Sequence, residues 1–157
     1  IDRFMFKVIV DYPNEEEELE ILQNQIILGK KEDIKPVVSI NNILAARNVL
    51  NEIHIAENLQ KYIISLINAT RKPSKYNIKD LGGLINFGAS PRASIYLALA
   101  AKAKAFIEKR GYVIPQDIRD IGKDILRHRI ILSYEAEAEE ITTDDIISRL
   151  YGSIPTP

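Results

Sequence analysis

The sequence predicts an all-α protein, a helical bundle preceded by one short N-terminal strand. Most of the chain repeats apolar residues at helical spacing. Helix start and stop signals such as Ser39, Pro91 and Gly111 separate these segments. A run of aromatic and β-branched residues typical of a strand occupies residues 4–10, and residues 130–132 look extended.

The strand expected at residues 4–10 needs a neighbouring strand, because its backbone donors and acceptors must be satisfied. A helical domain offers none, so we expect this strand to belong to a sheet that lies mostly outside the chain. The chain also begins at Ile1 without a methionine, from which we expect a piece of a longer protein.

Two helices are expected before residue 56. Pro13 and Asn14 begin the first, and the glutamates at 15–18 complement the positive end of its dipole. Its apolar stripe and its end signals follow in order: Leu19, Leu22, Ile26, Ile27, then Gly29, Lys30 and Lys31. Ser39 caps the second helix, and a group of apolar residues supplies the face that we expect to be buried: Ile43, Leu44, Ala46, Val49, Leu50 and Ile53.

A third helix is expected over residues 56–71, where five apolar residues match the i, i+3, i+4, i+7 spacing: Leu59, Tyr62, Ile63, Leu66 and Ile67. Residues 72–89 form the longest irregular stretch, with one short turn expected within residues 81–87. Irregular connections of this length are usually functional.

The helix expected over residues 91–110 is apolar almost all round, which places it in the middle of the bundle, and Gly111 is expected to end it as the C′ residue. Pro115 begins the next helix, which ends in the basic cluster Arg127-His128-Arg129. Thr142 or Thr143 caps a last helix that stops near Gly152.

Composition excludes several classes of function. The 157 residues carry a formal net charge of −1, which gives no electrostatic reason to expect a nucleic-acid partner. Cysteine is absent, so disulfides and thiolate metal sites are excluded, and we expect a cytoplasmic location. No apolar run approaches the roughly 18 residues that span a bilayer, so we expect no membrane insertion.

The chain carries no complete active site. Its one Gly-Lys pair, Gly29-Lys30, is followed by Lys31, and Asn24 stands where a phosphate-binding loop needs its first glycine. Four carboxylates alternate with alanines at Glu135, Glu137, Glu139 and Glu140, but nothing else supports a metal there and we assign no metal ligand.

Two arginines are the candidate functional residues. Arg92 lies in the first turn of a helix, directly after a glycine loop that ends in Ser90 and Pro91. A cation is unfavourable at the positive end of a helix unless an anion such as a phosphate meets it. Arg3 lies just before the expected strand. Isolated arginines at the ends of elements suit the stabilisation of charge in phosphoryl transfer.

The chain resembles the MoxR family of AAA+ ATPases. Several runs carry the resemblance in order: Asp2-Arg3-Phe4-Met5-Phe6-Lys7, Asp11-Tyr12-Pro13, Gly88-Ala89-Ser90-Pro91-Arg92-Ala93, Leu126-Arg127-His128-Arg129-Ile130, Ile131-Leu132-Ser133 and Glu135-Ala136. They span essentially the whole chain and match the C-terminal portion of the family.

The resemblance implies that residues 1–12 are the end of an AAA+ core, with a strand and an arginine-finger segment, and that residues 13–157 are the helical lid domain. It implies that Arg92 is the sensor-2 arginine, which contacts nucleotide phosphates, and that Arg3 is an arginine finger acting on the adjacent subunit. It further implies ATP and Mg as ligands of the full-length protein, a homo-oligomeric ring expected to be a hexamer, and chaperone-like activity, often with von Willebrand factor A domain proteins.

The chain departs from the family pattern because the Walker A loop, the Walker B strand and sensor 1 are absent, so it should neither hydrolyse ATP nor hold it tightly. The stretch at 72–89 is also longer than in many members. Arg127 and Arg129 could line a nucleotide or subunit interface, although cations are favourable at any helix C-terminus. The alternatives are a non-enzymatic helical interaction module and a DNA-binding helical domain, against which the net charge argues.

Overall fold

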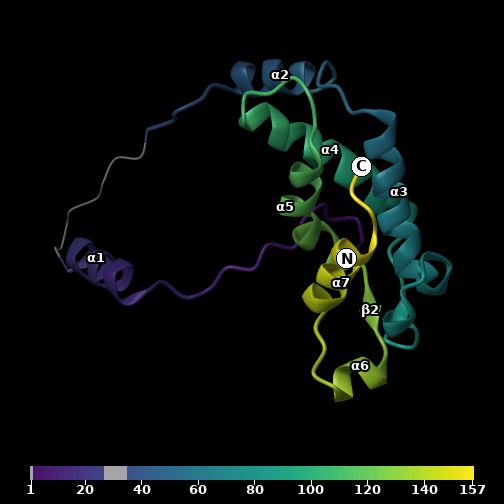
Figure 1. Ribbon diagram of the computed structural model, residues 1–157. Helices are drawn as coiled ribbons and strands as arrows, with labels where there is room; N and C mark the ends of the chain where they lie inside the picture. Colours follow the sequence, from purple (N-terminus) through teal and green to yellow (C-terminus); the bar gives the residue numbers. More distant parts are fainter. Residues whose placement is uncertain (1, 27–34) are drawn as a thin grey trace.

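The computed structural model describes residues 2–26 and 35–157 and confirms the all-α class (Figure 1). In chain order the elements are α1 (Glu15–Gln25), α2 (Ile40–Val49), α3 (Glu57–Arg71), the 3₁₀ turns η1 (Pro73–Tyr76) and η2 (Lys79–Leu81), β1 (Ile85–Phe87), α4 (Pro91–Ile107), α5 (Pro115–Leu126), β2 (Ile131–Leu132), α6 (Tyr134–Ala138) and α7 (Thr143–Ser153). The described helices include none that is long and apolar enough to cross a membrane.

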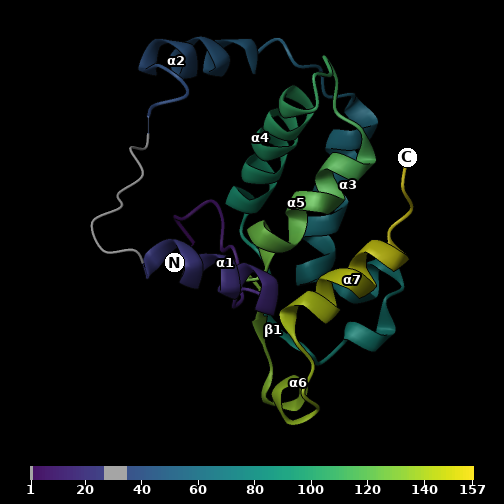
Figure 2. The ribbon, with the colours of Figure 1, turned by 90° about the vertical axis from the view of Figure 1, so that its left-hand side faces the viewer.

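Helices α3, α4, α5 and α7 form the bundle, in which α4 contacts α3 and α5, and α7 contacts α3 and α5 (Figure 2). The apolar stripe predicted for α3 is buried in this core. Alanines at 93, 100, 101 and 105 on the buried side of α4 allow its neighbours to approach closely. The four-helix core therefore fixes the position of the N-terminal end of α4 and the C-terminal end of α5.

Helix α4 is not buried all round, which corrects the prediction of a central helix. Ile95, Leu99 and Ile107 are 59%, 51% and 71% exposed. Leu99 and Ile107 line an open groove of about 640 Å³ together with other apolar side chains: Met5, Phe6, Leu50 and Ile121. The apolar pattern of α4 predicted its burial correctly on one side only, because α3 and α5 pack on that side.

Helix α4 also ends before Arg110, and Gly111 is not its C′ residue. Lys109 takes the left-handed conformation, with φ of 58°. The Arg110 N–H then donates to the Ala105 carbonyl at 2.8 Å, and the Lys109 N–H donates to the Phe106 carbonyl at 2.9 Å. These two bonds close the last turn around a lysine, where glycine is the residue usually expected.

The strand predicted at residues 4–10, all of which the structure describes, is not formed. Its Lys7 N–H donates to the Asp124 carbonyl at the end of α5, at 2.8 Å. The pairing expected for a strand requires an adjacent strand, and the described chain brings a helix end to this segment instead. The extended segment near residue 131 is confirmed as β2, but its antiparallel partner is β1, where only a short turn was predicted.

Helices α1 and α2 lie apart from the bundle core (Figure 1). Every residue of α1 is exposed, and so is every residue of α2 except the half-buried Ala46. Asn14, where the first helix was expected to begin, is its N-cap, and the predicted cap Ser39 is confirmed. On the face of the second helix that was predicted to be buried, Ile43, Leu44 and Val49 are exposed, whereas Ile53, which lies beyond the end of α2, is buried. An amphipathic pattern identifies an apolar face and does not identify what covers it. The predicted Ile27, Gly29, Lys30 and Lys31 of the α1 end lie outside the described residues.

Candidate functional site

The glycine loop before α4 is held against the end of α3. The Ala89 N–H donates to the Thr70 hydroxyl oxygen at 2.9 Å, and the Arg71 guanidinium donates to the Ala89 carbonyl at 2.6 Å. At Gly88 a Cβ atom would lie 2.5 Å from the Thr70 carbonyl oxygen, so only glycine lets the two backbones approach this closely. The loop therefore presents Ser90 and Arg92 at a defined place.

This close approach makes Gly88→Ala a sensitive test of the loop. We expect the variant to lower the free energy of unfolding by about 1–3 kcal/mol, because backbone atoms must move to admit the methyl group. Urea denaturation followed by circular dichroism would measure this. Gly111→Ala is the matched control, since a Cβ there has nothing within 4 Å. Equal stability of the two variants would contradict the described packing.

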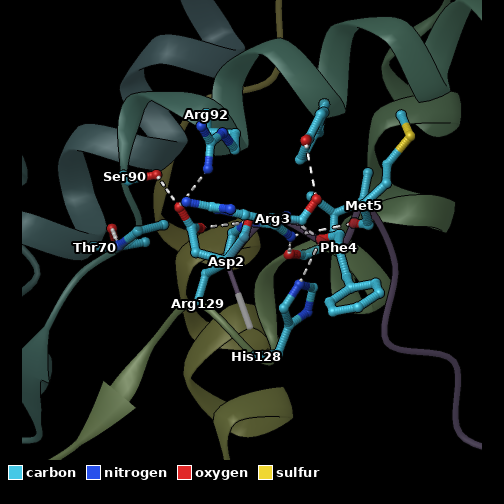
Figure 3. A network of polar contacts seen from close by, with 12 residues as sticks. Asp2, Arg3, Phe4, Met5, Thr70, Ser90, Arg92, His128 and Arg129 are labelled. Carbon is cyan, nitrogen blue, oxygen red and sulfur yellow. Dashed lines mark hydrogen bonds and ion pairs between the residues drawn. The ribbon is translucent and has the colours of Figure 1, made fainter.

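Ser90 occupies the N-cap position of α4, but its side chain makes no capping bond. Its hydroxyl instead donates to the Asp2 carboxylate at 3.1 Å (Figure 3). The same Asp2 oxygen lies 3.7 Å from Arg92 Nη1. Asp2 thus joins the N-terminal segment to the first turn of α4. The Arg92 side chain is 47% exposed, so it faces both this carboxylate and solvent.

Arg3 follows Asp2 directly and is exposed. The Tyr96 hydroxyl donates to the Arg3 backbone carbonyl at 3.2 Å, which leaves the Arg3 guanidinium outside this contact. The two arginines, 89 positions apart in sequence, are therefore brought to the same end of α4. The sequence identified each one separately and did not predict that they would meet.

Arg129 binds the turn formed by residues 2–5. Its side chain has no exposed surface, and its Nε pairs with the Asp2 carboxylate at 3.1 Å. Its Nη atoms donate to the backbone carbonyls of Asp2, Phe4, Met5 and Ile125. The guanidinium also lies 5.1 Å from the centre of the Tyr96 ring. Burial lowers the pKa of Arg129, and Asp2 opposes this change.

Arg127 and His128 extend the same contact. Arg127 pairs with Asp144 at 3.0 Å and with Asp124, and its Nη1 donates to the Lys7 carbonyl at 2.6 Å. The hydrogen bond to Asp144 raises the pKa of Arg127 and lowers that of Asp144. His128 Nε2 lies 3.0 Å from the Phe4 carbonyl. From the sequence, Arg127 and Arg129 were either residues of a nucleotide or subunit interface or cations at a helix C-terminus. Sequence reasoning missed Asp2 and His128, because the order of residues along the chain does not show that residues 2–7 fold back onto this cluster.

The environment of His128 favours its neutral form. Burial lowers its pKa below 6.5, and the charges of Arg129 and Lys7 act in the same direction, whereas the bond to Phe4 opposes them. Its Nδ1 is buried and makes no hydrogen bond to any described residue. A proton added there would be an unpaired buried donor.

His128 therefore predicts a pH dependence of stability. The unfolded chain binds a proton near pH 6.5 and the folded chain only at lower pH, so this contribution is present above pH 6.5 and is lost as pH falls through the lowered pKa. Between pH 7 and pH 5 the free energy of unfolding should fall more steeply for the wild type than for His128→Gln. Urea denaturation at each pH measures this, and parallel curves would contradict it.

The sequence assigned no metal ligand among the carboxylates at 135–140. Among residues 2–26 and 35–157, no three His, Asp or Glu side chains gather closely enough to hold a metal ion.

Comparison with known proteins shows which family the chain resembles. The family model of the AAA lid domain matches residues 83–150. Chaperone MoxR1 of Mycobacterium tuberculosis is 36% identical over 99% of this chain and 41% of its own length, and Protein MoxR of Paracoccus denitrificans is 31% identical over 99% and 49%. The crystal structure of a "putative ATPase" from Cytophaga hutchinsonii matches with a TM-score of 0.94 and 43% identity, over 99% of this chain and 47% of that one. The chain thus spans less than half the length of each of these proteins.

Proposed function

Because this chain belongs to the MoxR family of AAA+ ATPases and contains an AAA lid domain, we propose that it couples ATP binding and hydrolysis to chaperone-like remodelling or activation of partner proteins. The observation that carries the proposal is that Asp2, the chain neighbour of the exposed Arg3, lies 3.7 Å from the half-exposed Arg92 at the N-terminus of α4. Two such arginines can neutralise charge that spreads over phosphate oxygens in phosphoryl transfer.

The described residues at the N-terminus of α4 are better suited to contact an anion than to hold a nucleotide tightly. The N-terminus of α4 offers partial positive charge, and Arg92 lies in its first turn, where Asp2 is its counter-ion among the described residues, at 3.7 Å. The chain contains no glycine-rich phosphate loop of its own. We propose that residues outside this chain hold ATP and its Mg, and that Arg92 and Arg3 contact the phosphates.

We further propose that both arginines serve the same nucleotide. Asp2 contacts Arg92 and is the chain neighbour of Arg3, so one phosphate group placed at this end of α4 is within reach of both. If Arg3 acts as an arginine finger on the adjacent subunit, Arg92 then acts on that subunit's nucleotide as well. In this proposal Arg92 exchanges Asp2 for a phosphate when ATP binds, and the exchange moves the lid.

This function requires an assembly. We propose a homo-oligomeric ring, expected to be a hexamer, in which this chain contacts its own AAA+ core and the neighbouring subunits. We also propose a cytoplasmic location and partners that include von Willebrand factor A domain proteins. Nucleic acid is not proposed as a partner, because the net charge of −1 offers it no attraction.

The parent gene provides the test. We expect the coding sequence before Ile1 to contain Gly-x-x-x-x-Gly-Lys-Thr, and the protein that it encodes to hydrolyse ATP. We expect no measurable heat when ATP is titrated into the 157-residue chain alone. A parent without this loop and without ATPase activity would contradict the proposal and favour a helical interaction module.

A further inference from the structure

We propose that Arg129 is a positioning residue, which fixes the turn at residues 2–5 and thereby sets where Arg3 lies relative to Arg92. The inference rests on the proposed roles of those two arginines and adds a residue that acts through them. Arg129 itself has a fully buried side chain and is not expected to touch a nucleotide.

Side chains of the bundle bind every backbone carbonyl of the turn. Arg129 donates to the carbonyls of Asp2, Phe4 and Met5. Tyr96 donates to the remaining one, that of Arg3. Bonds to backbone carbonyls specify the path of the chain rather than its side chains. The turn is therefore held in one conformation while the Arg3 side chain stays exposed.

Arg129 is also linked to Arg92, through the Asp2 carboxylate. The Asp2 carboxylate accepts from Arg129 Nε through one oxygen, and its other oxygen accepts from Ser90 and faces Arg92. Arg129 thus fixes Asp2, and Asp2 in turn fixes the first turn of α4. Figure 3 shows these side chains meeting around the N-terminal segment.

Arginine suits this position better than an apolar residue or lysine would. A buried guanidinium is costly to desolvate, and apolar residues of similar volume often stabilise a fold equally well. What an apolar residue cannot do is bind several carbonyls in a fixed geometry. Lysine has three donors on one atom and cannot reproduce the planar fork of arginine. Arg129→Lys therefore keeps the positive charge and removes the planar arrangement of donors that binds the carbonyls.

One experiment follows the turn directly and needs no ATP. The 157-residue chain has no cysteine, so spin labels can be placed at Arg3→Cys and at Lys61→Cys on the exposed surface of α3. We expect a single narrow distance distribution by double electron–electron resonance, and a clearly broader one when Arg129→Lys is added. Arg149→Lys, a partly exposed arginine 4.0 Å from Asp80, is the matched control and should leave the distribution narrow.

The second readout is hydrolysis by the full-length ATPase that contains this chain. Arg129→Lys should lower kcat by about tenfold while the affinity for a fluorescent ATP analogue stays within about twofold, because a misplaced catalytic group costs rate rather than binding. If Arg129 had only a structural role, Arg129→Lys would lower the fraction of folded protein and leave the kcat of each folded ring unchanged. An unchanged kcat, or an unchanged distance distribution, would overturn the inference.

The outcomes also separate this inference from the proposed function. Full ATPase activity in Arg3→Ala and Arg92→Ala would refute the proposed function whatever the spin labels show. If Arg129→Lys fails to fold, the Tyr96→Phe variant replaces it as the test. This variant removes the hydroxyl that donates to the Arg3 carbonyl and keeps the aromatic ring beside Arg129. It should broaden the distribution and lower kcat by about threefold. If Tyr96→Phe kept both the narrow distance distribution and the kcat of the wild type, the proposed role of the turn would be overturned.

Discussion

Replacing Arg3 with alanine is expected to lower the kcat of the full-length ATPase by about 10³-fold, the scale on which an arginine finger acts in phosphoryl transfer. The fold should survive, because the contacts of this residue run through its backbone carbonyl and not through its exposed side chain. Steady-state ATPase assays on rings of equal size measure the loss. Arg149→Ala, which removes an arginine remote from the site, is the control and should leave kcat within about twofold.

Mixed rings then test whether Arg3 acts on the neighbouring subunit. Subunits with Arg3→Ala keep their own ATP-binding loop, and a second set of subunits keeps Arg3 while that loop is disabled. Neither set should hydrolyse ATP alone, and mixing them should restore activity if Arg3 crosses the interface. Failure of the mixture to regain activity would count against an arginine finger.

Arg92→Ala is expected to lower kcat by about a hundredfold, the cost of losing one preorganised donor to a charged transition state. Its effect on stability should be small, because the half-exposed Arg92 side chain loses only an ion pair at 3.7 Å, a contact worth less than about 1 kcal/mol. ATPase kinetics and thermal unfolding of the same preparation separate the two effects.

Arg92→Lys sharpens this prediction. Lysine keeps the charge but presents a point charge in place of a planar fork, so activity between that of the wild type and that of Arg92→Ala is expected. Full activity in Arg92→Ala, with the protein folded, would contradict a role in hydrolysis.

Much of the bundle was predictable from local patterns. The stripe of α3, the Pro91 and Pro115 helix starts and the Thr142 cap depend on residues close together in sequence, and the structure confirms all of them. The loop at Gly88 was also recognisable, although its reason was not. The glycine is needed because Thr70, 18 positions earlier, lies against it.

Most of the features that the sequence did not predict depend on long-range contacts. Ser90 has the residue type and position of a cap, yet its hydroxyl donates to Asp2. Residues 4–10 have the composition of a strand, yet the described chain gives them helix ends as neighbours. The role of Arg129 follows from contacts to residues about 125 positions away, and a favourable helix-end cation already explained it adequately from sequence.

The exposed apolar faces of α1, α2 and α4 also depend on contacts that the local sequence does not show. Their apolar residues were identified correctly, and for α2 and α4 burial was predicted from them, yet many of these side chains are exposed. Burial, however, belongs to the packed structure, and the chain spans 41% and 49% of the two curated relatives compared here. In the proposed assembly, the core and the neighbouring subunits are the candidates to cover these faces.

The double variant Arg3→Ala/Arg92→Ala tests most directly whether the two arginines serve one nucleotide. Groups that act as a unit on one transition state are strongly non-additive when they are removed together. We therefore predict that the kcat of the double variant lies within about threefold of the kcat of the slower single variant. A kcat reduced by the product of the two single losses would mean that Arg3 and Arg92 act independently, and would contradict a shared site at the N-terminus of α4.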